Sequence, residues 1–85
     1  MKLLLFTRQG CCLCVGLEER LRELANPPEL ELLDVDSNPN LQAKYGLEVP
    51  LLSHNGELLA RVPPRLQGDR LAQWLQKQIA SQELA

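Results

Sequence analysis

Short apolar runs alternate with amphipathic segments along the first third of the chain. Residues 3–6 form an uninterrupted apolar run, which predicts a buried strand. After Gly10 the apolar residues recur at intervals of three and four, with charged residues between them. This spacing places one apolar stripe along a helix, formed by Cys14, Leu17, Leu21 and Leu24. The predicted helix ends at Asn26-Pro27-Pro28, because proline disfavours helical backbone in the residue before it.

The middle of the chain repeats the change from strand to helix. Residues 30–35 are mostly apolar and predict a second, largely buried strand. Asn38 and Pro39 follow as a preferred N-cap and a preferred first helical residue, and Gly46 supplies a helix end. A strand, a helix and a second strand in this order predict a parallel pair joined by a right-handed crossover.

The last third predicts a hairpin and a helix. Residues 50–53 and 58–62 are expected to pair as antiparallel strands, because Asn55-Gly56 between them is a strong hairpin turn. Gly68-Asp69 precedes a final helix, and we expect the tail, residues 81–85, to fray. The inward face of that helix comprises Leu71, Trp74, Leu75, Gln78 and Ile79. The order β-α-β-α-β-β-α predicts a single α/β domain over residues 1–85, with a four-stranded mixed sheet flanked by helices.

The composition is that of a small globular domain, and it excludes several functions. The 85 residues are 45% hydrophobic, which is enough for one core. A net charge of -2 and an aromatic content of 4% oppose a nucleic-acid surface, which needs basic or stacking side chains. The N-terminal apolar run is too short for a signal peptide, and no segment is long enough to span a bilayer. We therefore expect a cytoplasmic, monomeric protein without nucleic-acid or membrane partners.

All three cysteines lie within four consecutive positions, as Cys11, Cys12 and Cys14. A structural disulfide framework would spread its cysteines along the chain, whereas a cytoplasmic cluster is typical of redox or metal chemistry. At about 100° per helical residue, Cys11 and Cys14 return to nearly the same side, while Cys12 and Cys14 point apart. A bridge between the neighbours Cys11 and Cys12 would strain the peptide between them. The predicted disulfide is therefore Cys11–Cys14.

The two paired thiols are expected to differ in exposure and reactivity. Cys14 lies on the apolar stripe and should face inward, whereas Cys11 precedes the first helical turn and should be more exposed. Unpaired N–H groups and the positive end of the helix dipole favour a thiolate at that position, and the thiolate is the attacking species. Cys11 is thus the candidate nucleophile and Cys14 the resolving thiol, with Arg8 as an additional source of positive charge.

Other interpretations of the cysteine cluster stay open. The cysteines would also suit a strand–helix junction simply as small apolar residues. A zinc site within one chain needs about four ligands, and His54 is the only further soft ligand in the sequence. A metal ion or iron–sulfur cluster shared by two chains would use Cys12 as an extra ligand. The remaining alternative is a redox-inactive interaction domain.

The segment from Thr7 to Cys14, together with Val49-Pro50 and Gly68-Asp69 further along, resembles a glutaredoxin. It is most similar to the small glutaredoxin-like proteins with a Gly-Cys-x-Leu-Cys signature, and the resemblance covers almost the whole chain. The resemblance implies a thioredoxin-like fold with strand order 2-1-3-4 and a cis peptide before Pro50. It also implies a thiol–disulfide oxidoreductase that acts on protein disulfides or on mixed disulfides with glutathione, with Cys11 attacking and Cys14 resolving.

The same resemblance identifies a set of substrate-binding residues. They are Arg8, Cys12, Leu13, Val49, Pro50, Gly68 and Asp69. Arg8 would hold a carboxylate of glutathione and Asp69 its amino group. The chain departs from the usual pattern at Cys12-Leu13, where glutaredoxins have Pro-Tyr, and before Asp69, where their Gly-Gly pair is missing. We expect no metal and no permanently bound cofactor, with glutathione as the candidate reductant and a disulfide-containing protein or low-molecular-weight thiol as the partner.

Overall fold

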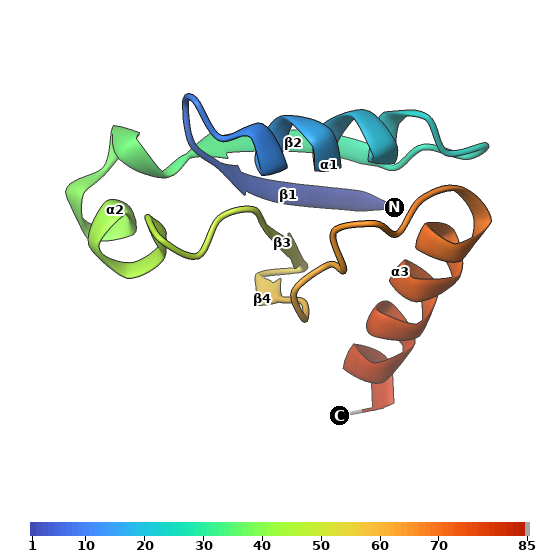
Figure 1. Cartoon of the computed structure of the whole chain (residues 1–85). Coiled ribbons are helices and arrows are strands. Elements are labelled where there is room, and N and C mark those ends of the chain that lie inside the picture. The colour runs from blue at the N-terminus through green and yellow to red at the C-terminus, as the bar shows by residue number, and fades with distance from the viewer. Residues whose placement is uncertain (85) are drawn as a thin grey trace.

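The computed structural model describes residues 1–84 and combines a four-stranded sheet with three α-helices (Figure 1). The strands are β1 (Lys2–Thr7), β2 (Glu29–Asp34), β3 (Leu51–His54) and β4 (Glu57–Leu58). The helices are α1 (Cys12–Arg22), α2 (Pro39–Tyr45) and α3 (Gly68–Leu84), and a short 3₁₀ turn (Val35–Ser37) precedes α2. None of the described helices is both long enough and apolar enough to cross a membrane.

The sheet has the order β2-β1-β3-β4, which is the order that the resemblance implies. Strand β1 is parallel to β2 and antiparallel to β3, and β4 is antiparallel to β3. Leu5 in the centre of β1 pairs with Leu32 on one side and Leu52 on the other. Because β1 is central, the turn that follows it starts from the most firmly held strand of the sheet. The predicted thioredoxin-like architecture is confirmed.

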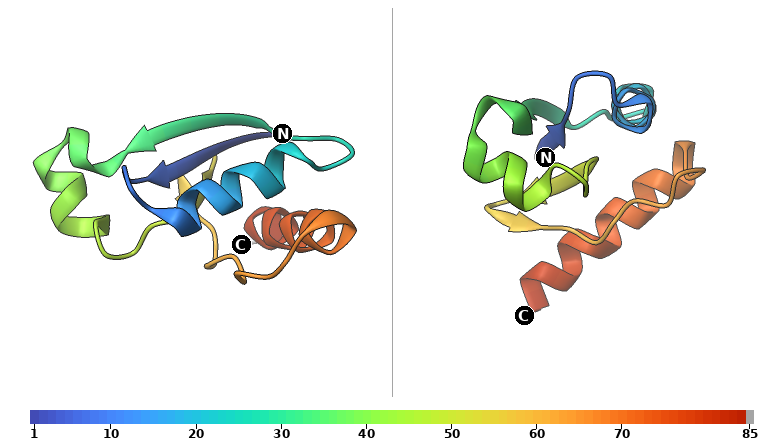
Figure 2. Two further views of the ribbon diagram at one scale, coloured as in Figure 1. Left: turned by 45° about the horizontal axis from the view of Figure 1, so that its top comes forward. Right: turned by 60° about the vertical axis from the view of Figure 1, so that its left-hand side comes forward.

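The main core lies between one face of the sheet and the two helices α1 and α3. Alternate residues of β1, Leu3 and Leu5, are completely buried against these helices. The other core members are Leu17, Leu21, Leu24, Leu52, Leu59, Val62, Leu71 and Leu75. Phe6 faces the opposite side, where its ring centroid lies 5.2 Å from that of Tyr45 at the end of α2. Figure 2 accordingly shows α2 on the far side of the sheet from α1 and α3.

The prediction that the second strand is largely buried is wrong. Strand β2 lies at the edge of the sheet, and Leu32 within it is 43% exposed. Leu30 packs against the core, but Glu29, Glu31 and Asp34 are exposed. A run of apolar residues does not distinguish an edge strand from a central one, because the pattern does not state which neighbours cover it.

The returning strand of the hairpin is shorter than predicted. It was expected over residues 58–62, but β4 covers only Glu57–Leu58. The Leu59 N–H still donates to the Leu52 carbonyl at 2.9 Å, whereas the Ala60 N–H donates to Gln78 Oε1 of α3 at 3.1 Å. From Ala60 onwards the backbone therefore no longer pairs with β3, and its first hydrogen bond is to α3.

Helix α3 continues past the point where we expected fraying. It runs to Leu84, while Ala85 lies outside the described residues. His54 Nδ1 lies 2.9 Å from Gln82 Oε1, and Gln82 Nε2 donates to the His54 carbonyl at 3.4 Å. These contacts tie the last turns of the helix to the end of β3, which the sequence pattern did not indicate.

Candidate active site

A tight turn links the central strand to the first helix and carries the cysteines. Strand β1 ends at Thr7, and Gly10 adopts a φ of 80°, a left-handed conformation that glycine tolerates best. The Cys11 N–H donates to the Arg8 carbonyl at 3.1 Å, which closes the turn. Cys11 then serves as the N-cap of α1. The first turn of this helix is therefore held over the end of the central strand.

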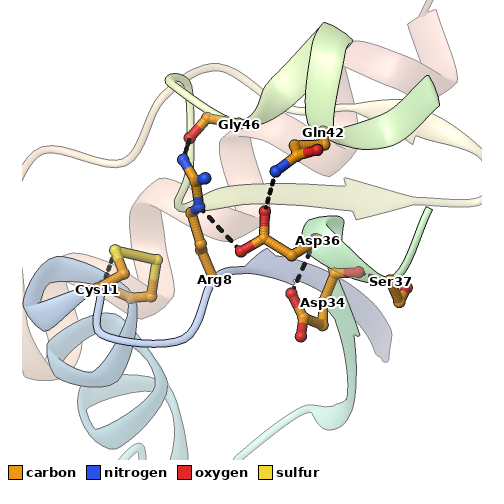
Figure 3. A network of polar contacts seen from close by, with 8 residues as sticks. Arg8, Cys11, Asp34, Asp36, Ser37, Gln42 and Gly46 are labelled. Atoms are coloured by element: carbon orange, nitrogen blue, oxygen red, sulfur yellow. Dashed lines mark hydrogen bonds and ion pairs between the residues drawn. A yellow bond between two sulfur atoms is a disulfide. The ribbon is translucent and has the colours of Figure 1, made fainter. Parts of the chain in front are cut away.

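Cys11 and Cys14 form a disulfide, with their Cα atoms 5.2 Å apart (Figure 3). This is the pairing that helix geometry predicted. Cys14 is 1% exposed, whereas Cys11 is only partly buried. The Cys14 N–H donates to Cys11 Sγ at 3.2 Å, so a backbone donor of the first helical turn already points at this sulfur. The pair has one accessible and one enclosed sulfur.

Cys12 is a free cysteine on the exposed side of α1. It borders a shallow depression of about 350 Å³ that Cys11 also lines, together with Gly10, Val15, Gly16 and Glu19. The depression is separate from the groove that Leu13 lines on the other side of the helix start. The expectation that Cys12 contacts substrate therefore remains a prediction.

Arg8 extends from the turn towards α2, as Figure 3 shows. Its Nε donates to Asp36 Oδ2 and its Nη1 donates to the Gly46 carbonyl, both at 3.0 Å. Gln42 Nε2 donates to the second carboxylate oxygen of Asp36, also at 3.0 Å. Arg8 thus connects the cysteine turn to α2, and Asp36 partly neutralises the charge that we expected to act on Cys11 or on a glutathione carboxylate. Asp36 is 28 residues away in sequence, so no local pattern indicates this contact.

We expect Asp36→Asn to lower the free energy of unfolding by about 0.5–1 kcal/mol, because the charged hydrogen bond is lost at a site that is only about one third exposed. Urea unfolding of the reduced protein measures this change. Glu31→Gln is the matched control, because the Lys2–Glu31 pair is longer, at 3.7 Å, and its side chains are 65% and 64% exposed. Equal losses of unfolding free energy in the two variants would show that the Arg8–Asp36 contact does not stabilise the fold more than an exposed ion pair does.

Leu13, which lies between the paired cysteines in sequence, and Pro50 line the same groove. The groove measures about 120 Å³, and its other lining residues are Leu17, Arg20, Arg61, Val62 and Pro64. The Val49-Pro50 peptide is cis, as the resemblance implies, and both residues are partly buried. The structure thus brings together two of the residues predicted to bind substrate. The contribution of Arg61, Val62 and Pro64 was missed, because the sequence placed the first two in a strand and indicated no binding role for the third.

Gly68 and Asp69 lie away from the cysteines. They line a different hollow together with Met1 and with residues 23–28, which follow the C-terminal end of α1. Cys11 caps the other end of this helix, whose 11 residues span roughly 16 Å. The loop before α3 runs along α1, because Arg20 Nη1 of α1 donates to the Leu66 carbonyl of this loop at 2.6 Å. The loop therefore carries Gly68 and Asp69 to the far end of α1. The structure therefore does not combine Gly68 and Asp69 with Cys11 in one site.

The described residues gather no three His, Cys, Asp or Glu side chains that could hold a metal ion within one chain. The cysteine cluster was the candidate set of metal ligands in the sequence. Two of its three sulfurs are joined in the disulfide. His54 lies at the end of β3 and contacts Gln82 of α3 instead of the cysteines. The bond between the paired sulfurs is of the kind that thiol–disulfide exchange forms and breaks.

Comparison with a protein-family model identifies the family to which this chain belongs. The model of the glutaredoxin-like domain (DUF836) matches residues 2–76. The chain belongs to this glutaredoxin-like family. Its disulfide and its Gly10-Cys11 turn lie within the matched residues, as does the Val49-Pro50 segment.

Relatives of this glutaredoxin-like chain occur in several organisms. Uncharacterized proteins of Mycobacterium tuberculosis and Mycobacterium bovis are 32% identical over 59 residues, which span 61% of this chain and 61% of each relative. The X-ray structure of a structural genomics target protein from X. campestris is 30% identical, with a TM-score of 0.70 over 88% of this chain and 96% of that one. The structure of a malarial protein, 21% identical with a TM-score of 0.53 over 92% and 96% of the two chains, is similar in fold alone.

Proposed function

We propose that this glutaredoxin-like domain catalyses thiol–disulfide exchange, with Cys11 as the nucleophile and Cys14 as the resolving thiol. The observation that carries the proposal is the disulfide at the start of α1, in which one sulfur is partly accessible and the other almost fully buried. A substrate disulfide can reach Cys11 but not Cys14 without opening the core. The Cys14 N–H and the helix N-terminus favour negative charge on Cys11 Sγ.

The exchange proceeds in two steps from the reduced protein. The Cys11 thiolate attacks one sulfur of the substrate disulfide, forms a mixed disulfide, and releases the other half as a thiolate. Cys14 then gives up its proton and attacks Cys11 Sγ, so that the Cys11–Cys14 bond forms and the second substrate thiolate leaves. Two electrons have passed from the dithiol to the substrate, which takes up two protons to become two thiols.

Regeneration of the dithiol requires a thiol reductant, which is oxidised to a disulfide in turn. Glutathione is the candidate for this role, and the substrates are disulfides of proteins or mixed disulfides with glutathione. We further propose that the domain works as a monomer in the cytoplasm, where thiol reductants keep cysteine pairs reduced. No resident metal or organic cofactor takes part in this scheme.

The pKa of the Cys11 thiol in the reduced protein is expected to lie below the ordinary value of about 8.5. The physical cause is the Cys14 N–H, which donates to the sulfur and favours its charged form. The measurement is the rate of alkylation at Cys11 as a function of pH, in a reduced Cys12→Ser variant with the labelled peptide identified by mass spectrometry. A cysteine-containing tripeptide labelled under the same conditions is the reference. A Cys11 midpoint at or above that of the reference would contradict the proposed activation.

A further inference from the structure

The groove between α1 and the loop after β4 offers apolar surface around Leu13, the residue that directly precedes Cys14 in the sequence. We propose that this groove binds an aliphatic side chain next to the reacting cysteine of a protein substrate, and that Arg20 and Arg61 at its border attract a carboxylate of the same segment. This inference rests on the proposed thiol–disulfide exchange and names the class of disulfide that the site prefers.

The lining of the groove is built for an apolar group. Leu13 lies between the paired cysteines in sequence and is 64% exposed, although a leucine gains free energy when it is buried. Pro50, Val62 and Pro64 face it, so a ligand in the groove touches hydrocarbon from three separated segments. A volume of about 120 Å³ corresponds to roughly four water molecules, which is close to the four carbons of a leucine or isoleucine side chain.

Arg20 supplies uncompensated positive charge at the same groove. Its guanidinium donates to two backbone carbonyls, those of Gly16 at 3.3 Å and Leu66 at 2.6 Å. No ion pair joins Arg20 to a carboxylate among the described side chains. These carbonyls orient the guanidinium without neutralising it. A substrate carboxylate at the groove border therefore gains an attraction that a neutral side chain does not.

Arg61 is the second positive group, but its charge is already shared. Its Nη2 donates to Glu48 Oε2 at 2.6 Å and to the Glu48 carbonyl at 3.2 Å. Both side chains of this pair are more than half exposed, so water screens the pair strongly. We therefore assign the larger part of the carboxylate preference to Arg20 and the smaller part to Arg61.

A protein segment suits this groove better than glutathione does. Glutathione brings two carboxylates but no aliphatic side chain to fill the space between Leu13 and Val62. Arg8 is engaged by Asp36 and Gly46, and Asp69 lies near the opposite end of α1, so neither is available beside Cys11 for a glutathione end group. The groove thus favours a substrate whose reacting cysteine is followed or preceded by an aliphatic and an acidic residue.

A panel of peptide mixed disulfides tests this inference. Each peptide carries one cysteine joined to the same chromophoric aromatic thiol, and the flanking residues are leucine and glutamate, leucine and glutamine, serine and glutamate, or serine and glutamine, in both orders. The second-order rate constant of exchange with the reduced protein is measured for every peptide. We expect leucine to raise the rate about tenfold over serine, and glutamate to raise it about three- to fivefold over glutamine at low salt. The glutamate preference should fall in 1 M salt.

Variants assign each preference to its residue. Leu13→Ser should remove the preference for leucine, and Arg20→Gln should remove most of the preference for glutamate. Leu32→Ser and Arg70→Gln are matched controls, because both residues are exposed and neither lines the groove, and both preferences should persist in them. The salt dependence of the unaltered protein tests the charge effect even if Arg20→Gln fails to fold.

The outcomes separate this inference from the proposed function. If the free aromatic disulfide is reduced but all the peptides react alike, or the mixed disulfide of glutathione reacts faster than the leucine and glutamate peptide, the groove inference is overturned and thiol–disulfide exchange stands. If no disulfide of any kind reacts through Cys11, both proposals fail.

Discussion

Replacing Cys11 by serine is expected to abolish disulfide exchange and to leave only the uncatalysed rate. The loss should be on the order of 10³ or more, as for other nucleophiles that form a covalent intermediate. A serine hydroxyl can accept the Cys14 N–H in the same place, so the start of α1 remains capped, but it cannot form a mixed disulfide. The measurement is the rate of reduction of a chromophoric disulfide by the protein in the presence of a thiol reductant.

Cys12→Ser is the matched control for this substitution. Cys12 is adjacent in sequence, exposed, and outside the disulfide. Its replacement keeps the attacking thiol of Cys11, so exchange should remain far above the uncatalysed rate, and a contact of Cys12 with substrate would change the rate only modestly. If Cys12→Ser loses as much activity as Cys11→Ser, the reactive thiol has been wrongly assigned. If Cys11→Ser reduces the disulfide as fast as the unaltered protein and both exceed the uncatalysed rate, Cys11 is not the nucleophile. If both proteins react only at the uncatalysed rate, the redox-inactive interaction domain is favoured.

Replacing Leu21 by alanine is expected to lower the free energy of unfolding by about 2–5 kcal/mol. Leu21 is completely buried on the face of α1 that packs over β1, and its truncation leaves a cavity where α1, α3 and the sheet meet. A domain of this size has a total stability on the order of 5–15 kcal/mol, so a large part of it would be lost. Urea unfolding followed by tryptophan fluorescence measures the change, since Trp74 packs against the same core.

Leu47→Ala is the matched control for the core substitution. It removes the same atoms from a side chain that is 94% exposed, so the free energy of unfolding should hardly change. Both variants are compared in the same redox state, because the Cys11–Cys14 disulfide adds its own contribution. A Leu21→Ala loss below about 1 kcal/mol would contradict the assigned packing of α1.

The order of elements and the cysteine pairing followed from local patterns. Helix periodicity placed Cys14, Leu17 and Leu21 on one buried face, and the return of Cys11 to the side of Cys14 is a property of the helix itself. What the patterns did not reveal depends on neighbours that are distant in sequence. The edge position of β2 is set by strand order, and the early end of β4 by the contact between Ala60 and Gln78.

The same distinction separates the predicted from the unpredicted parts of the candidate site. Arg8 was expected to act near Cys11, but a carboxylate 28 residues away holds it. Gly68 and Asp69 were carried over from a resemblance in element order, whereas the loop before α3 follows α1 and moves them to its other end. In the sequence, Arg20 is one of several charged residues on the solvent-exposed face of a helix. Its position at the groove depends on the loop before α3, which the sequence pattern does not place.

The identity of the sulfur that joins the substrate is the most direct test of the central claim. A reduced Cys14→Ser variant is mixed with a chromophoric disulfide, the reaction is stopped with acid, and the modified peptide is identified by mass spectrometry. Because the resolving thiol is missing, the mixed disulfide should accumulate in a one-to-one ratio on Cys11. Accumulation on Cys12, or no mixed disulfide at all, would contradict the account.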